Sequence, residues 1–103
     1  MNRETRKRLA GLSASIATIK DEAEELKGRL EGIRDEIEEI RDDEQDKYDN
    51  MPEGLQESER GEAMETAIEA LDEAYSSADE ACDGLDIGDS LDEAIEHLKD
   101  AAQ

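Results

Sequence analysis

The sequence predicts an all-α fold: a long heptad helix forms a helical hairpin with a second helix, followed by a short C-terminal third helix. Ten apolar residues recur at alternating spacings of three and four between residues 9 and 40, as in a coiled coil. A second series with the same spacing runs through residues 64–85, and turn-forming residues separate the two series. We expect the hairpin to dimerise into a coiled coil or four-helix-type bundle, because this arrangement buries every apolar stripe.

The first helix is expected over about residues 3–47. Its a and d positions are all apolar, and they form the expected oligomer seam: Leu9, Leu12, Ile16, Ile19, Ala23, Leu26, Leu30, Ile33, Ile37 and Ile40. Three glycines lie at outer heptad positions, where each costs about 1 kcal/mol relative to alanine. They do not interrupt the seam, so the helix is expected to be continuous.

Charges beside this seam favour a parallel dimer, in which a g residue of one chain meets the following e residue of the other. The resulting pairs are Glu22 with Lys27 and Glu36 with Arg41, against one repulsive pair, Arg29 with Arg34. An antiparallel dimer would set the basic e positions against each other. Exposed ion pairs are individually weak, so packing against the second helix can overrule this preference.

A hinge is expected over residues 48–57, because this segment contains four turn-forming residues. They are Asp49, Asn50, Pro52 and Gly54. The second helix is expected over about residues 58–83, with a seam of mostly large residues: Met64, Ile68, Leu71, Tyr75, Ala78, Cys82 and Leu85. A stripe of small residues lies beside that seam: Ala63, Ala67, Ala70, Ala74, Ser77 and Ala81. A face this broad predicts contact with two neighbouring helices.

The third helix is expected over about residues 90–101, after a break in which Gly84 is the expected C-cap of the second helix. Ser90 and Glu93 have the spacing of a capping box, which predicts that Ser90 begins the third helix. With 103 residues and few large apolar side chains, the chain is expected to form a single helical domain, residues 1–103.

The composition is strongly acidic, with a formal net charge of -20. Residues 1–41 carry nine basic and ten acidic side chains, whereas residues 42–103 carry three basic and 22 acidic ones. Such a surface repels nucleic acid and anionic membranes and attracts basic protein surfaces. A single cysteine and the lack of an apolar run of membrane-spanning length predict a cytoplasmic protein.

Motifs for catalysis or metal binding are missing, so we expect a non-enzymatic protein without a cofactor. His97 has no nucleophile at a partnering spacing, and Cys82 lies on the apolar seam of the second helix. Residues 79–90 fit an EF-hand loop in part, but Ala81 and Ser90 do not supply the ligands needed at loop positions 3 and 12.

The feature that points to function is a stripe of carboxylates at helical spacing on the second helix. The candidate partner-binding residues are Glu62, Glu65, Glu69, Asp72, Glu73, Asp79, Glu80 and Asp83. Residues 57–83 hold ten acidic side chains and one arginine over about 40 Å, whereas a DNA strand of that length carries about 12 charges. One hypothesis is a DNA mimic that binds the basic cleft of a nucleic-acid-binding protein. The alternative is a structural or scaffolding coiled coil whose acidic face serves solubility.

The segment YDNMPEGLQESERGE, Tyr48–Glu62, resembles a segment of small acidic coiled-coil proteins of phages and bacterial mobile elements. In those proteins a long heptad helix precedes it and an acidic amphipathic helix follows. The resemblance implies a phage or mobile-element setting, in which short acidic proteins include anti-restriction and anti-CRISPR inhibitors. In this segment Tyr48, Met51 and Leu55 either cover the end of the helix pair or form an exposed partner patch.

Overall fold

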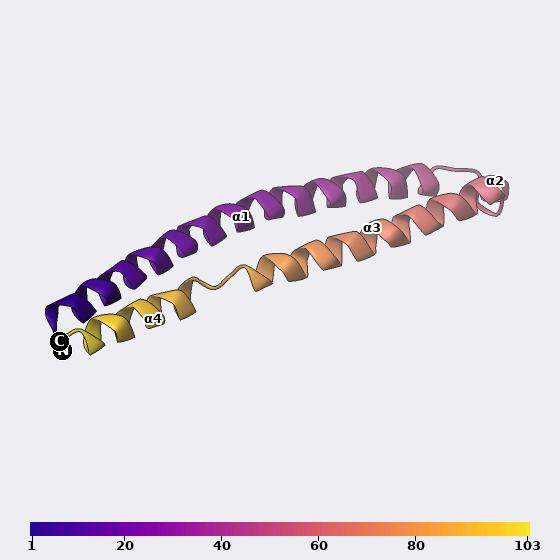
Figure 1. Cartoon of the computed structure of the whole chain (residues 1–103). Helices are drawn as coiled ribbons and strands as arrows, with labels where there is room; N and C mark the ends of the chain where they lie inside the picture. The colour runs from indigo at the N-terminus through magenta and orange to yellow at the C-terminus, as the bar shows by residue number, and fades with distance from the viewer. The chain divides into compact units, whose positions relative to one another are not determined.

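The computed structural model describes the whole chain, residues 1–103, as four helices without a β-strand (Figure 1). The helices are α1 (Arg3–Asp49), α2 (Glu53–Gln56), α3 (Glu59–Gly84) and α4 (Gly88–Ala101). The predicted all-α class with coiled-coil-like helices is therefore confirmed. None of the helices has the length and the apolar surface needed to cross a membrane.

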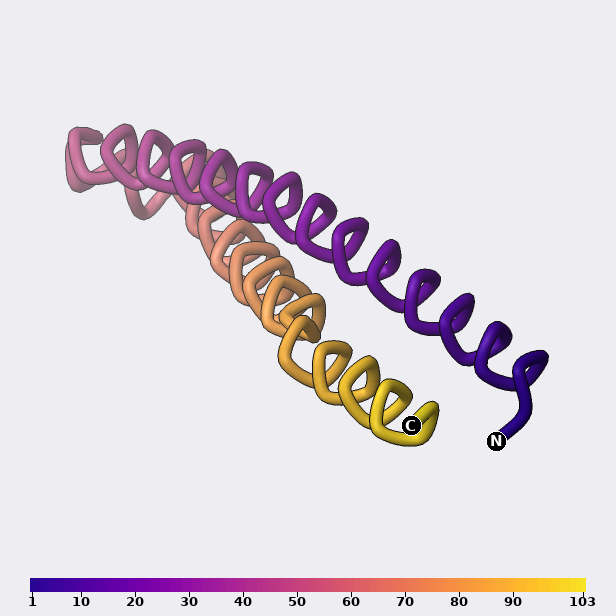
Figure 2. Tube along the Cα trace, turned by 90° about the vertical axis from the view of Figure 1, so that its left-hand side faces the viewer, coloured from indigo at the N-terminus to yellow at the C-terminus, as the bar shows by residue number.

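The chain forms two compact units. Unit 1 combines Met1–Gly28 with Asp83–Gln103, and unit 2 is the continuous segment Arg29–Cys82. Both termini belong to unit 1 (Figure 2). Unit 1 therefore joins the two ends of the sequence, whereas unit 2 is built from neighbouring segments.

In unit 2 the C-terminal half of α1 packs antiparallel to α3. Arg34 of α1 contacts Asp79 of α3, and Arg41, seven residues later on α1, contacts Asp72, seven residues earlier on α3. Ile68 is 7% exposed and lies in the core of the pair. The core is thin, and many of its apolar side chains stay half-buried: Leu30, Ile37, Met64, Leu71 and Tyr75.

In unit 1 the N-terminal half of α1 packs against α4, and Ala23 is its buried apolar residue. Lys20 pairs with Asp92 of α4 at 3.0 Å, and Lys27 pairs with Asp86 of the turn before α4 at 3.8 Å. The apolar side chains that α1 and α4 direct into this contact are half-buried: Leu9, Ile16, Leu91, Ile95 and Leu98.

The two apolar rows of α1 have different environments. The a positions are half-buried or buried, whereas the d positions are 48–54% exposed: Leu12, Ile19, Leu26, Ile33 and Ile40. The e positions are half-buried instead, and the four charged e residues form ion pairs with α3, α4 or the turn between these helices. The intrachain contact of α1 is therefore centred between rows a and e, and row d is left uncovered.

The expected hinge contains a short helix, α2, and forms a defined corner between α1 and α3. The Gln56 side-chain amide donates to the backbone carbonyl of Tyr48 at 2.9 Å. Gly61 is buried in the first turn of α3, and a Cβ there would lie 2.1 Å from the carbonyl oxygen of Gln56. Glycine is therefore required at position 61, because the α2 backbone occupies the space of a side chain.

Two predicted helix ends are wrong in detail. Gly84 ends α3 without the positive φ of a glycine C-cap, because Asp86 and Ile87 continue with short backbone hydrogen bonds to Asp83 and Leu85. The N-cap of α4 is Ile87, without a side-chain cap, so Ser90 lies inside the first turn of the helix. The backbone hydrogen bonds of the turn, and not a capping box, therefore determine where α3 ends and α4 begins.

Candidate protein-binding surface

The predicted carboxylate stripe of α3 divides into side chains that face α1 and side chains that face solvent. Seven of the eight residues lie in unit 2, and Asp83 is the first residue of the second segment of unit 1. Asp72, Asp79 and Glu65 contact α1. The other five are exposed and form no ion pair: Glu62, Glu69, Glu73, Glu80 and Asp83.

The carboxylates that face α1 meet a basic row on that helix. Arg41 Nε lies 2.7 Å from Asp72 Oδ1, and Arg34 Nη1 lies 2.9 Å from Asp79 Oδ1. The hydrogen bond from Arg41 to Asp72 raises the pKa of that guanidinium, and those from Arg34 to Asp35 and Asp79 raise the pKa of Arg34. Both arginines therefore stay charged and neutralise two carboxylates of the stripe.

These contacts follow the heptad. Successive contact residues on α1 are seven positions apart. Their partners on α3 are also seven positions apart, but they run in the opposite direction, so the two sequence numbers of every pair add to the same value. Arg34 meets Asp79, Arg41 meets Asp72 and Tyr48 meets Glu65. The e positions of two antiparallel helices face each other in a coiled coil, which explains this regularity. The signal was present in the sequence as a basic e row on α1 and an acidic row of equal spacing on α3.

Tyr48 ends the series of contacts at the corner of unit 2. Its hydroxyl donates a hydrogen bond to the Glu65 carboxylate, and this bond raises the pKa of the Tyr48 phenol. Tyr75 lies in the middle of the helix pair, 6.0 Å from the guanidinium carbon of Arg34, and burial raises the pKa of its phenol. Both tyrosines therefore serve packing between α1 and α3.

The engaged e positions change the argument for a parallel dimer. Lys27 pairs with Asp86, and Arg41 pairs with Asp72, within the same chain. These two cations were the expected partners of Glu22 and Glu36 of a second chain. The charges that favoured the parallel orientation are thus already occupied.

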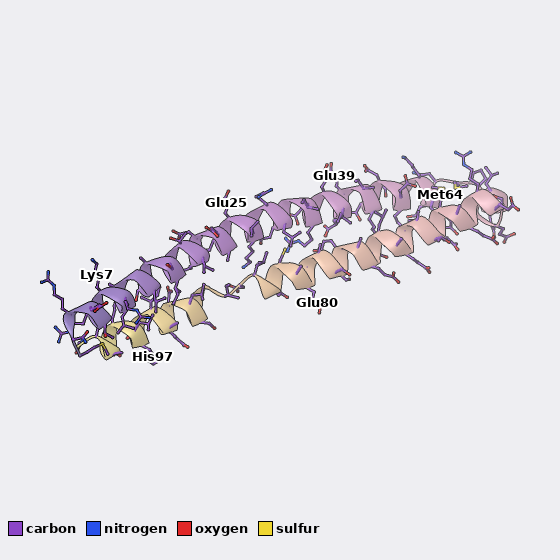
Figure 3. The ribbon with its side chains drawn as sticks, viewed as in Figure 1. Lys7, Glu25, Glu39, Met64, Glu80 and His97 are labelled. Carbon is purple, nitrogen blue, oxygen red and sulfur yellow. The ribbon has the colours of Figure 1, made fainter.

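Four exposed carboxylates of the predicted stripe, all in unit 2, form the candidate surface, which we call the free acidic row: Glu62, Glu69, Glu73 and Glu80. Their positions recur at helical spacing beside the row of α3 that contacts α1. Glu69 lines a shallow cavity with Arg41 and Tyr48 of α1, whereas Figure 3 shows Glu80 directed away from that helix. Arg60 is the sole basic residue of α3. The row is therefore an uncompensated line of negative charge.

Residues with catalytic or metal-binding chemistry are dispersed. His97 is exposed on α4 and points outward in Figure 3, whereas Cys82 is 2% exposed. No three histidine, cysteine, aspartate or glutamate side chains are grouped as a metal ion would require. Comparisons with protein families, curated proteins and solved structures found no match. The surface chemistry of α3 is what remains to indicate a function.

Proposed function

We propose that this chain is a non-enzymatic, acidic protein-binding module that docks on the basic surface of a nucleic-acid-binding protein. The free acidic row of α3 is the contact surface. In a phage or mobile-element setting, the partner is a host defence nuclease of the restriction or CRISPR type, met in the host cytoplasm. The module acts by occupying a site that otherwise receives a nucleic-acid backbone.

The observation that carries this proposal is that the free acidic row has no cation of its own. Its four carboxylates are exposed and form no ion pair with the chain. The helix keeps them at fixed spacing, so the entropic cost of ordering these charges when a basic partner binds is reduced. Residues 57–83 lose only Asp72 and Asp79 to arginines, so most of their negative charge stays available.

The proposal includes a homodimer in a four-helix-type bundle. Two chains give each particle two acidic rows, and nucleic-acid-binding clefts present basic residues to two phosphate strands. Long-range attraction between such surfaces speeds association and weakens as salt rises.

A second candidate function is structural: a scaffolding coiled coil whose acidic face serves solubility. The contacts of Asp72, Asp79 and Glu65 with α1 favour it, because they show that part of the stripe stabilises the helix pair. On this alternative the free acidic row is solvated and has no partner.

The test is retention of nucleic-acid-binding proteins from a bacterial lysate on the immobilised chain, at low and at high salt. A variant with glutamine at Glu62, Glu69, Glu73 and Glu80 should lose this retention. A matched control neutralises four exposed carboxylates of α1 instead, at Asp21, Glu25, Glu39 and Asp46, and should retain the same proteins. Added duplex DNA should release the captured proteins from the unaltered chain.

If both variants lose retention equally, net charge and not the free acidic row is responsible for the binding, which favours the structural alternative. No nucleic-acid-binding protein retained even at low salt would contradict the proposal. Both variants alter exposed, unpaired side chains, so circular dichroism should report unchanged helix content for each.

A further inference from the structure

We propose that a second copy of this chain docks antiparallel on the exposed d row of α1, with Leu26 of one copy against Leu26 of the other. The inference rests on the homodimer included in the proposed function and assigns its contact surface and its orientation. It reverses the parallel orientation expected from the sequence.

The first support is the exposure of the d row. Five large aliphatic side chains at heptad spacing are each about half exposed, from Leu12 at 54% to Ile40 at 49%. They lie on one face of the continuous helix α1, and both units leave their part of that row uncovered. An aligned row of this kind is typical of a helix contact and not of scattered surface residues.

The second support is the charged row beside it. The g positions of α1 border row d on the side away from α3 and α4, and their charged residues are exposed and form no ion pair: Arg8, Glu22, Arg29, Glu36 and Asp43. The e row on the other side is already engaged within the chain. The g row is therefore the set of charges that a docking helix meets.

Charge complementarity of the g row selects the antiparallel orientation. The five exposed d residues are centred on Leu26, so placing a twofold axis there aligns the whole row with that of the copy. In this register Glu22 of each copy faces Arg29 of the other, and Arg8 faces Asp43. Four ion pairs result by symmetry, and no like charges meet across the contact.

The ends of α1 favour the same orientation. Residues 1–8 carry four basic and one acidic side chain, whereas residues 42–49 carry five acidic and one basic. An antiparallel contact brings the basic end of each α1 to the acidic end of the other. A parallel contact would set each end of α1 against an end of the same charge, which is destabilising.

The decisive measurement is the dimer dissociation constant of charge variants by sedimentation equilibrium at low salt. The unaltered chain should sediment as a dimer of 11.4 kDa subunits at micromolar concentration. Glu22→Arg, which places arginines opposite each other at two symmetric points, should weaken the dimer about tenfold or more. Asp21→Arg makes the same change of charge on the opposite side of α1 and should leave the constant within about threefold.

Combining Glu22→Arg with Arg29→Glu exchanges the charges and should restore the dimer to within about threefold of the unaltered chain. A monomer at all concentrations, or equal effects of Glu22→Arg and Asp21→Arg, would overturn the proposal. The free acidic row is unchanged in these variants, so salt-dependent partner binding by a monomeric variant would leave the proposed binding function standing.

Orientation is measured separately by disulfide formation in a Cys82→Ala background. Chains with Arg8→Cys mixed with chains with Asp43→Cys should form mixed crosslinked dimers, whereas each chain incubated alone should crosslink poorly. Efficient crosslinking of the Arg8→Cys chain with itself would indicate a parallel dimer and overturn the assignment. This readout does not depend on how far the charge variants weaken the dimer.

Discussion

Units 1 and 2 each cover the a row of their own part of α1, but they do so with different contacts. In unit 2 the a row packs on α3, two arginines pair with aspartates, and the corner at α2 joins the helices. In unit 1 the a row packs on α4, and lysines take the place of the arginines. The contacts of unit 2 join residues 17–45 positions apart, whereas Lys20 and Asp92 are 72 apart.

The difference shows which unit supports the other. A contact across 72 residues carries a larger loop-closure cost than one across 17, unless the intervening chain is already folded. Unit 2 is that intervening chain. The arginines of unit 2 also present N–H donors in a fixed planar arrangement, whereas the ammonium groups of the lysines in unit 1 are less directional. We infer that unit 2 forms first and that α4 docks on α1 afterwards, with unit 1 the more readily opened part.

The largest expected effect is from Gly61→Ala, which tests whether the corner is required for both units. The added Cβ would lie 2.1 Å from the Gln56 carbonyl oxygen, so α2 and α3 must separate. We expect a loss of about 3 kcal/mol in unfolding free energy, measured by chemical denaturation. Hydrogen exchange should show lower protection in α4 as well as in α3, because unit 1 depends on unit 2.

Gly54→Ala is the matched control, because a Cβ at that position of α2 would meet no atom within 4 Å. It should leave stability unchanged or raise it by up to about 1 kcal/mol, since alanine favours the helix. Equal losses for the two variants would show that the α2 backbone does not press on Gly61.

A smaller effect is expected from shortening one apolar side chain in each unit. Ile68 is 7% exposed in unit 2, so Ile68→Ala should cost about 2–3 kcal/mol. Ile95 is half-buried in unit 1, and Ile95→Ala should cost about 1 kcal/mol. In hydrogen exchange, Ile95→Ala should affect α4 alone, whereas Ile68→Ala should affect both units. Loss of protection throughout α3 in Ile95→Ala would contradict the order inferred above.

The sequence allowed the helices of both units to be predicted, but not which row of α1 each unit covers. Heptad spacing identifies a and d as apolar, and Ile16 and Ile19 are equivalent on that ground. The structure distinguishes them because the packed face of α1 is centred between rows a and e. On the e side of that face, Arg34 and Arg41 form ion pairs with Asp79 and Asp72. The orientation of α1 about its own axis depends on the partner helix, so it cannot be predicted from the sequence of α1 alone.

The acidic stripe illustrates the same limit. Helical spacing placed the eight carboxylates of α3 on a broad polar face, and their charge was evident. Which of them face α1 depends on the basic residues opposite, so Asp72 and Asp79 could not be separated from Glu73 and Glu80 without the pairing of the two helices. Gly61 was also missed as a structural residue, because its constraint comes from a backbone carbonyl five positions earlier.

The smallest expected effect concerns Tyr48, the last e-row contact of unit 2. Its pKa is raised by the hydrogen bond to Glu65 above the ordinary value of about 10. The phenol binds its proton more tightly in the folded chain than in the unfolded chain. Stabilisation from this bond is thus fully present below pH of about 10 and is lost as the pH rises through the folded-state pKa.

The chain has two tyrosines, so Tyr75→Phe leaves Tyr48 as the single phenol, and its titration can be followed by tyrosinate absorbance. In that background Glu65→Gln should lower the pKa of Tyr48 toward the ordinary value, because it removes the carboxylate that accepts the hydrogen bond and repels the phenolate. Glu62→Gln removes an exposed carboxylate three residues earlier on α3 and should leave the titration almost unchanged. If both substitutions shift the pKa equally, general acidity of α3 and not the contact at the corner governs Tyr48, and the e-row pairing of unit 2 ends at Arg41.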